Sequence, residues 1–223
     1  MKRILFFSLL VIFFLFMFNI FSQQNNNKNT QSTIDQFIEA KDEYQQLTQQ
    51  ENLVPATFAG GCFWCLEGPL ESIEGVKGVI LGYMGGDVVN PTYQQVSSGT
   101  TGHKEVAQAF YDPQVTDYRD LVDIYWKFID PTDAGGQFAD RGSQYKIGIF
   151  YHTEEQERIA REYISEMEKS GKYKQPIVVE VLPATDFYLA EDNHQNYYKK
   201  QSQNYKEYYQ GSGREAYVES NKK

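Results

Sequence analysis

The chain has 223 residues, of which 41% are hydrophobic and 23% charged, enough for one ordinary domain with an extension at an end. These proportions exclude a disordered polyelectrolyte and a polytopic membrane protein. The formal net charge is −9, and an acidic surface repels phosphate backbones, so no nucleic acid partner is expected.

The first residues predict an export signal or a membrane anchor. Lys2 and Arg3 precede an uncharged apolar run over residues 4–18, a positive start and apolar core typical of a secretory signal. The cleavage site near Ser22 is imperfect, and the run is close to the lower length limit for a spanning helix. Residues 1–22 are therefore a cleaved signal or an anchor formed by residues 4–21. Both interpretations place the domain outside the cytoplasm, in the periplasm or secreted.

The remaining chain divides into three parts. Residues 23–52 are rich in Asn and Gln and predict a polar linker, with a marginal helix as an option within it. Residues 53–210 carry the apolar periodicity of a folded domain. Residues 211–223 predict a polar tail.

Alternating apolar residues and turn signals predict the domain's elements. Residues 118–129 have helical spacing, and Thr153 begins a second helix that ends at Gly171. A tyrosine-rich helix or loop covers residues 193–205. Strands are predicted at residues 56–59, 76–84, 105–111, 145–151 and 177–182.

The order of these elements favours an α+β fold. Strands 76–84 and 105–111 follow each other without a long helix between them. This pattern indicates a two-layer sandwich of the split β-α-β (ferredoxin-like) kind rather than a doubly wound parallel sheet.

Cys62 and Cys65 are the only cysteines, and they lie in the segment Gly60-Gly61-Cys62-Phe63-Trp64-Cys65 between a strand and a predicted helix. Unpaired N–H groups at a helix start would lower the pKa of the Cys62 thiol below about 8.5. Structural zinc usually needs four Cys or His ligands, and the histidines are scattered, so no metal site is expected. Redox chemistry is favoured over a structural disulfide, because a bridge across three residues closes a very small loop.

Several motifs, in order, resemble those of the A-type peptide methionine sulfoxide reductases. The resemblance spans roughly residues 57–198. The motifs are Gly61-Cys62-Phe63-Trp64, Gly82-Tyr83-Met84-Gly85-Gly86, Asn90-Pro91-Thr92-Tyr93, Gly102-His103-Lys104-Glu105, Tyr111-Asp112-Pro113, Asp130-Pro131-Thr132, Asp140-Arg141-Gly142-Ser143-Gln144-Tyr145 and Glu191-Asp192-Asn193-His194.

The resemblance implies a catalytic group for the reduction of methionine S-sulfoxide. Cys62 would attack the sulfoxide sulfur, and Glu105 would protonate or hydrogen-bond the oxygen, a task that requires an enclosed site and a raised pKa. Tyr93 and Tyr145 would hold the same oxygen through their hydroxyl groups. Without the resemblance, Glu105 would be interpreted as a surface residue at a strand end.

The resemblance also implies substrate-binding residues. Phe63 and Trp64 would cradle the S-methyl group, although such aromatic residues are by default core residues. Asp140 would organise the site, and His194 would lie at the rim of the pocket. Leu189 departs from the proline that relatives commonly carry, so the geometry of its loop is less certain than the chemistry.

A second departure concerns the resolving cysteine, which many relatives carry in a glycine-rich C-terminal tail. Here the only thiol able to condense with a Cys62 sulfenic acid is Cys65. No cofactor is expected, because a thioredoxin-like dithiol would supply the electrons. The expected partners are this reductant and oxidised proteins or peptides that contain methionine sulfoxide, with the protein acting as a monomer.

Two other functions are compatible with parts of the sequence. A general thiol–disulfide oxidoreductase would use the Cys-x-x-Cys alone, but Phe63 and Trp64 replace the small or proline-bearing pair usual in such enzymes. An exported binding module would carry one structural disulfide. Neither alternative explains the ordered motifs, so the reductase is the preferred interpretation.

Overall fold

A computed structural model of the chain describes residues 39–221. The predicted signal or anchor and most of the predicted linker lie outside these residues. No helix within the described range is long and apolar enough to cross a membrane. Residues Ala40–Lys223 form one compact unit.

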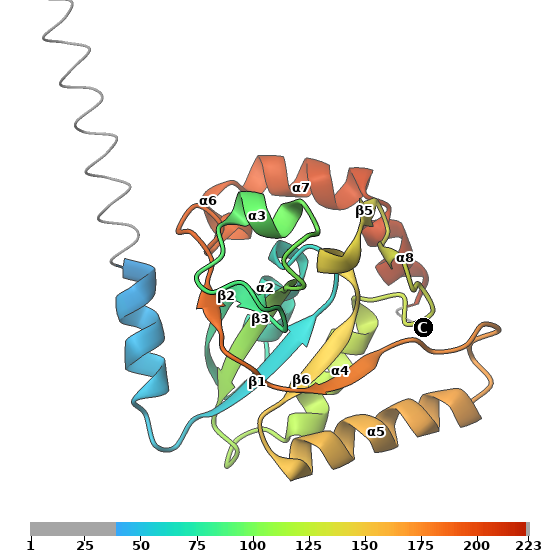
Figure 1. The fold of residues 1–223 in the computed structure, drawn as a ribbon. Helices are drawn as coiled ribbons and strands as arrows, with labels where there is room; N and C mark the ends of the chain where they lie inside the picture. Colours follow the sequence, from blue (N-terminus) through green and yellow to red (C-terminus); the bar gives the residue numbers. More distant parts are fainter. Residues whose placement is uncertain (1–38, 222–223) are drawn as a thin grey trace, which may run out of the picture. The chain divides into compact units, whose positions relative to one another are not determined.

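The centre of this unit is a six-stranded sheet in the order β7-β6-β1-β3-β2-β8 (Figure 1). The neighbours are antiparallel except for β6 and β7, which are parallel. The strands are β1 (Val54–Ala59), β2 (Val76–Met84), β3 (Lys104–Tyr111), β6 (Gly148–Tyr151), β7 (Glu180–Pro183) and β8 (Tyr188–Leu189). A separate ladder joins β4 (Gly136–Gln137) to β5 (Asp140–Arg141).

Three helices cover one face of the sheet: α2 (Trp64–Glu71), α4 (Tyr118–Lys127) and α5 (Glu154–Lys169). Alternate residues of the strands bury against them; Phe58, for example, stacks on Tyr125 with ring centroids 4.9 Å apart. The predicted α+β sandwich is confirmed. Further helices of the unit are α3 (Tyr93–Ser97), α6 (Tyr197–Lys200), α7 (Ser202–Gly211) and α8 (Arg214–Ser220).

A segment before residue 53 packs on the opposite face of the sheet, so the expected start of the domain at residue 53 is too late. Residues 39–48 are helical, and Leu47 joins Ile80 and Phe110 in an apolar cluster. Tyr44 adds a stacked contact with Phe187, with ring centroids 5.1 Å apart. The isolated helix signal was weak because its apolar residues are few, and only the sheet beneath them makes the helix stable.

The expected polar tail, residues 211–223, is also wrong. Residues Arg214–Ser220 form α8, and both Arg214 and Val218 are buried. The polar sequence of this segment predicted that it is exposed to solvent, because arginine is rarely fully buried.

Element boundaries differ locally from the predictions for identifiable reasons. The strand predicted over residues 145–151 begins at Gly148, because Ser143–Tyr145 form a 3₁₀ turn. The helix after Thr153 is confirmed, with the Thr153 hydroxyl accepting from the N–H of Gln156 at 3.1 Å. The short helix α3 was not predicted, although Thr92 and Gln95 form a capping box at its start.

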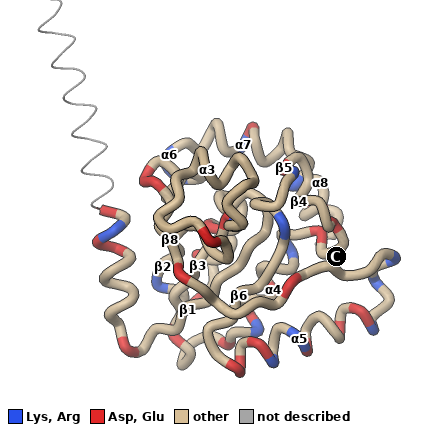
Figure 2. The backbone as a smooth tube through the Cα atoms, in the orientation of Figure 1, with Lys and Arg blue, Asp and Glu red and all other residues tan. Residues whose placement is uncertain are grey.

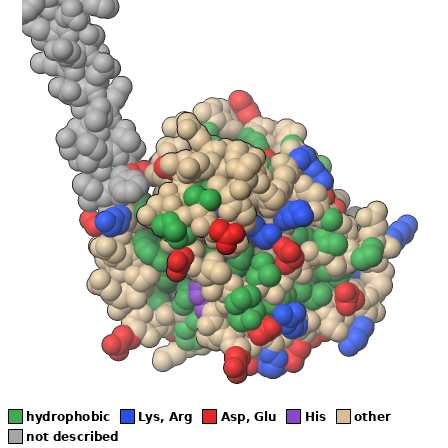
Figure 3. Space-filling view, viewed as in Figure 1, with side chains coloured by type: hydrophobic (Ala, Val, Ile, Leu, Met, Phe, Trp, Pro, Cys, Tyr) green, Lys and Arg blue, Asp and Glu red, His purple; other side chains and the backbone are tan. Residues whose placement is uncertain are grey.

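Basic and acidic residues lie close together along the backbone, most clearly in α5 (Figure 2). Arg158 pairs there with Glu155 and with Glu162, each at 2.6 Å. The space-filling view shows acidic and basic side chains interspersed among hydrophobic ones on the face drawn (Figure 3). The exposed ion pairs of Arg158 with Glu155 and Glu162 each contribute little to the stability of the fold.

Candidate active site

Cys62 follows a glycine turn between β1 and α2. Gly61 has a φ of +79°, and a Cβ atom there would lie 2.6 Å from Cβ of Gln137 and 2.7 Å from Nη2 of Arg214. Glycine is therefore required both by the backbone conformation and by the space. The turn leaves the Cys62 side chain 6% exposed, and Phe63 becomes the N-cap residue of α2.

Glu105 lies beside this turn because of the register of the sheet. Phe58 pairs with Ala107 in the antiparallel ladder, so Glu105, two residues earlier on β3, is level with the segment that follows β1. Its Oε2 atom accepts the N–H of Phe63 at 3.1 Å. Burial raises the pKa of Glu105 to about 8, more than the hydrogen bond from Phe63 lowers it. Glu105 therefore lies in an enclosed position, 2% exposed, as the proposed role of this carboxyl requires.

The predicted lowering of the Cys62 pKa is wrong. Burial raises the pKa of this thiol well above its ordinary value, and the hydrogen bond with Cys65 and the charge of Glu105 act in the same direction. The helix start does not compensate, because the N–H of Phe63 is already bonded to Glu105. In the absence of substrate, Cys62 is a thiol.

Cys65 differs from Cys62 although it is fully buried. Burial alone would raise its pKa, but the hydrogen bond from Cys62 and the charge of Arg214 outweigh it, so the pKa of Cys65 is lowered. Both cysteines are free in this structure.

Two tyrosines complete the polar side of the site. Tyr93 begins α3 and donates its N–H to Oε1 of Glu191 at 2.7 Å, while Tyr145 ends the 3₁₀ turn before β6. Burial raises the pKa of both phenols, and the charge of Glu105 is the next cause for each. Both hydroxyl groups are thus neutral donors in the neighbourhood of Glu105 and Cys62.

The apolar side consists of Phe63, Trp64 and their aromatic neighbours. Phe63 is 1% exposed and lies 5.2 Å from the ring of His194. Trp64 stacks on Tyr197, with ring centroids 3.9 Å apart. His194 also contacts Tyr93 at 4.4 Å, and burial lowers its pKa, so its ring is neutral at neutral pH. The sequence-predicted aromatic residues are therefore brought together beside Cys62.

Asp140 reaches the site from β5 and is held by a residue that the sequence did not single out. The hydroxyl of Tyr208, on α7, donates to Oδ2 of Asp140 at 2.5 Å. The charge of Asp140 contributes to the raised pKa values of Cys62 and Glu105. All nine predicted site residues thus converge on one region.

Three further residues support this region and were missed. Glu191 accepts from Tyr83 at 2.8 Å as well as from Tyr93, and so joins β2 to α3. Tyr208 packs edge-on against Trp64 at 5.8 Å. Arg214 lies behind the turn that carries Cys62. Glu191 lies in the motif Glu191-Asp192-Asn193-His194, but the sequence assigned it no role. The signals for the other two were the tyrosine-rich run before residue 210 and a single arginine in the supposed tail, and neither pattern is specific.

The hydrogen bond of Tyr208 leads to a testable prediction. With a methionine sulfoxide peptide, the substrate that the resemblance implies, we expect Tyr208→Phe to lower kcat/KM by about 3- to 10-fold, because one bond to a charged carboxyl is worth about 1.5–3 kcal/mol and only part acts on the reaction. Tyr209→Phe is the matched control on the same helix. Equal rates for the two variants, measured with dithiothreitol, would contradict a role for this bond.

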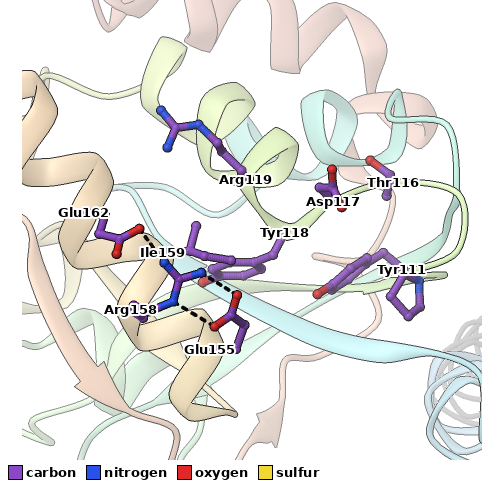
Figure 4. A pocket seen from close by; sticks show the side chains of 10 residues that line it. Tyr111, Thr116, Asp117, Tyr118, Arg119, Glu155, Arg158, Ile159 and Glu162 are labelled. Atoms are coloured by element: carbon purple, nitrogen blue, oxygen red, sulfur yellow. Dashed lines mark hydrogen bonds and ion pairs between the residues drawn. The ribbon is translucent and has the colours of Figure 1, made fainter.

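A separate hollow of about 410 Å³ lies between α4 and α5 and contains none of the predicted site residues (Figure 4). Tyr111 and Tyr118 lie side by side in its wall, with ring centroids 6.4 Å apart. The Tyr118 hydroxyl is buried and has no hydrogen-bond partner among the described residues.

We therefore expect Tyr118→Phe to leave the free energy of unfolding unchanged or to raise it by up to about 1 kcal/mol, since an unpaired buried hydroxyl carries a desolvation cost. Urea unfolding measures this change. A loss of more than about 1 kcal/mol would mean that the hydroxyl makes a stabilising bond.

A buried acid, two phenol donors and an adjacent pair of thiols define a thiol-based oxidoreductase. The family model described as "Peptide methionine sulfoxide reductase" matches residues 54–223. The chain belongs to this family, and it is an oxidoreductase that reduces methionine sulfoxide to methionine.

Individual relatives support this assignment. The chain is 51% identical over 172 residues to peptide methionine sulfoxide reductase MsrA of Listeria monocytogenes serotype 4b, covering 77% of this chain and 97% of that protein. It is 49% identical over 164 residues to MsrA of Bacillus velezensis, covering 74% and 93%.

Solved structures agree with the fold. Methionine sulfoxide reductase A of Corynebacterium diphtheriae superposes with a TM-score of 0.62 at 30% identity, covering 69% of this chain and 77% of that one. Mxr1 from Saccharomyces cerevisiae in its reduced form gives a TM-score of 0.63 at 29% identity, covering 70% and 89%.

Proposed function

We propose that the protein reduces the S epimer of methionine sulfoxide in oxidised proteins and peptides, with Cys62 as the nucleophile. The observation that carries this proposal is the placement of Cys62 beside Glu105, a buried carboxyl with a pKa of about 8. A carboxyl that is protonated at neutral pH can donate to the sulfoxide oxygen, which is a poor leaving group without a proton.

The first step forms sulfenic acid on Cys62. Its sulfur bonds to the sulfoxide sulfur while Glu105 gives its proton to the oxygen, and the proton of the Cys62 thiol returns to Glu105. Transfer of the hydroxyl to Cys62 releases methionine. Tyr93 and Tyr145 hold the oxygen by their neutral hydroxyl groups.

The aromatic wall provides the other half of substrate recognition. Phe63 and Trp64 bind the S-methyl group, and His194 and Asp140 position the surrounding side chains. An apolar wall opposite a set of polar donors distinguishes the methyl group from the oxygen of a sulfoxide. This division supports discrimination between the S and R epimers, because exchanging the two groups leaves buried donors unpaired.

The second step is the resolution of the sulfenic acid by Cys65. The sequence contains no other cysteine, and Cys65 lies three residues after Cys62 in the same turn, with its N–H donating to the Cys62 carbonyl at 3.1 Å. Condensation gives a Cys62–Cys65 disulfide and water. A thioredoxin-like dithiol then reduces the disulfide.

We further propose that this reductant acts outside the cytoplasm, in the periplasm or beyond, because residues 1–22 resemble an export signal or an anchor. The protein acts there as a monomer. Cys65→Ser should trap a mixed disulfide between Cys62 and the reductant in an extracytoplasmic fraction. Capture of cytoplasmic partners alone, with the chain retained in the cytoplasm, would contradict the export proposal.

The experiment that tests the proposed function uses the chain without residues 1–22, dithiothreitol, and a peptide carrying separated S and R sulfoxides. We expect turnover of the S epimer alone. Turnover of neither epimer by the folded, reduced protein would overturn the proposal, and insulin-disulfide reduction in its place would indicate a thiol–disulfide exchanger.

A further inference from the structure

A fully buried carboxylic acid on α2 has no part in the mechanism proposed above. Glu67 lies three residues after Trp64. Its Oε1 atom accepts the backbone N–H of Asn196 at 2.7 Å, whereas its Oε2 atom is buried without a hydrogen-bond partner among the described residues. Burial raises the pKa of Glu67 to about 8, so the carboxyl keeps its proton at neutral pH. Burying a half-satisfied carboxyl still costs free energy, which indicates a role that an apolar side chain could not fill.

Glu67 belongs to the face of α2 that carries α6. Residues three, four and seven apart lie on one side of a helix, and the residues of α2 on this side are Trp64, Glu67, Gly68 and Glu71. Tyr198 packs on Gly68, where a Cβ atom would lie 3.1 Å from its ring. The Glu71 carboxylate accepts from the hydroxyl of Tyr198 and pairs with Lys199. Those contacts of α6 are made by side chains, whereas the bond to Glu67 holds its backbone.

The bond to Glu67 determines where Tyr197 lies. Asn196 is the N-cap residue of α6 and has a left-handed backbone conformation, with a φ of +55°. Because Glu67 fixes the N–H of Asn196, the next residue is directed back onto α2. Tyr197 stacks there on Trp64, with ring centroids 3.9 Å and planes 12° apart. Two residues of one helix thus hold two adjacent residues of the C-terminal segment.

The Trp64 indole depends on ring contacts for its orientation. Its Nε1 atom is buried and has no hydrogen-bond partner in the part of the chain that the structure describes. The rings around the indole, with their centroid distances, are those of Tyr197 at 3.9 Å, His194 at 5.7 Å, Tyr208 at 5.8 Å and Phe63 at 6.4 Å. Without Tyr197 the indole would lose the closest contact that fixes its plane.

We propose that Glu67 is a positioning residue for the methyl group of the substrate. By accepting the N–H of Asn196 it places Tyr197 on Trp64, and the indole held in this way forms a rigid wall on which the S-methyl group packs. The proposal rests on the methyl-binding role of Trp64 proposed above. It gives a carboxyl that does not touch the substrate a part in the preference for a methyl group over a larger one.

A separate anchor holds the polar half of the site. The side chain of Gln195 accepts the N–H of Leu81 at 2.9 Å and donates to the carbonyls of Leu81 and Ala190 at 2.8 and 3.0 Å. These bonds tie the segment to β2 beside His194, whose ring contacts Tyr93. Loss of the Glu67 bond should therefore disturb the indole wall and leave the groups around the sulfoxide oxygen in place.

Two substitutions separate the hydrogen bond from the volume of the side chain. Glu67→Leu keeps a buried side chain of similar size without an acceptor, and Glu67→Gln keeps a carbonyl oxygen. In single turnovers with the S-sulfoxide peptide, we expect Glu67→Leu to raise KM about 3- to 10-fold, because binding must then order the indole. The rate at saturating peptide should stay within about 2-fold. Glu67→Gln should return KM to within about 2-fold of the unmodified protein.

The preference for methyl over ethyl gives a readout that a loss of stability alone would not change. One extra methylene is worth about 10-fold or more against a rigid apolar pocket. In Glu67→Leu the ratio of kcat/KM for the S-methyl sulfoxide over its S-ethyl analogue should fall at least about 3-fold, and Glu67→Gln should keep the ratio. An unchanged ratio in folded Glu67→Leu, or a fall that is equal in Glu67→Gln, would overturn the proposal.

Glu71→Leu is the matched control on the same face of α2. It removes the contacts of Glu71 with Tyr198 and Lys199 and leaves the bond between Glu67 and Asn196. We expect KM and the methyl-over-ethyl ratio to stay within about 2-fold. An effect equal to that of Glu67→Leu would assign the change to a general loosening of α6 and overturn the role of Glu67.

A measurement without substrate separates this proposal from the proposed function. The chain has two tryptophans, Trp64 and Trp126, so Trp126→Phe leaves Trp64 as the single fluorescent indole. Adding Glu67→Leu should at least double the acrylamide quenching of its fluorescence, and unchanged quenching would overturn the placement of Tyr197 by Glu67. Increased quenching with an unchanged KM and ratio would instead overturn the methyl-binding role of Trp64, and the proposal with it.

Discussion

Cys62→Ser should lower kcat/KM for a methionine S-sulfoxide peptide by at least about 10³-fold, to background. A serine hydroxyl is a far weaker nucleophile toward sulfur and cannot form a sulfenic acid, so neither step can proceed. The side chain is almost isosteric, and Cys62 makes no disulfide in this structure, so the fold should remain intact. The peptide assay with dithiothreitol measures the rate, and circular dichroism checks the fold.

Cys65→Ser is the matched control for this prediction. It lies three residues further along and is also buried, but it does not attack the substrate in the proposed mechanism. One methionine should therefore still be released per enzyme in the absence of reductant. Loss of this first turnover in Cys65→Ser, or retained turnover in Cys62→Ser, would reverse the roles assigned to the two cysteines.

Glu105→Gln should lower kcat/KM by about 10²- to 10³-fold, since the amide keeps a hydrogen-bond donor but cannot transfer a proton to the oxygen. The pH profile gives the more specific test. The pKa of Glu105 is raised to about 8, so its proton is present at neutral pH and is lost as the pH rises through about 8. The rate of methionine formation should fall above this pH, and Glu105→Gln should lack that fall.

The raised pKa of Glu105 also makes the free energy of unfolding depend on pH. Its pKa is higher in the folded protein, at about 8, than the ordinary value of 4.5. The proton is thus bound more tightly when folded, and the free energy of unfolding contributed by this group falls as the pH rises from about 4.5 to about 8. Glu105→Gln should be more stable than the unmodified chain at pH 8, as measured by urea unfolding. An equal or lower stability would mean that Glu105 is not buried as an acid.

Much of the fold could be predicted because local and tertiary preferences agree. The helix Tyr118–Lys127 has apolar residues at helical spacing and an acidic residue, Asp117, at its N-cap, and it buries the face that the spacing predicts. The strand Val76–Met84 is bounded by glycines and lies between β3 and the edge strand β8. The segment over residues 39–48 was predicted only as a marginal helix in a linker, and helix α8 was not predicted, since both depend on surfaces that exist only after the sheet has formed.

The candidate site, like the fold, could be predicted only in part from the sequence. The residues of the motifs were found, and the structure brings Cys62, Glu105, Tyr93 and Tyr145 together. The pKa shifts of the thiols were not found, because they depend on burial and on the charge of Arg214, which contacts the Gly60 carbonyl from 154 residues further along the sequence. The helix-start argument for Cys62 failed because the same N–H group serves Glu105.

The most direct test of the two-thiol mechanism is peptide mass mapping after one turnover with the S-sulfoxide peptide and no reductant. The mechanism predicts one methionine released per chain and a disulfide that joins Cys62 to Cys65. Methionine release with both thiols still free, or no release from the folded and reduced protein, would contradict it.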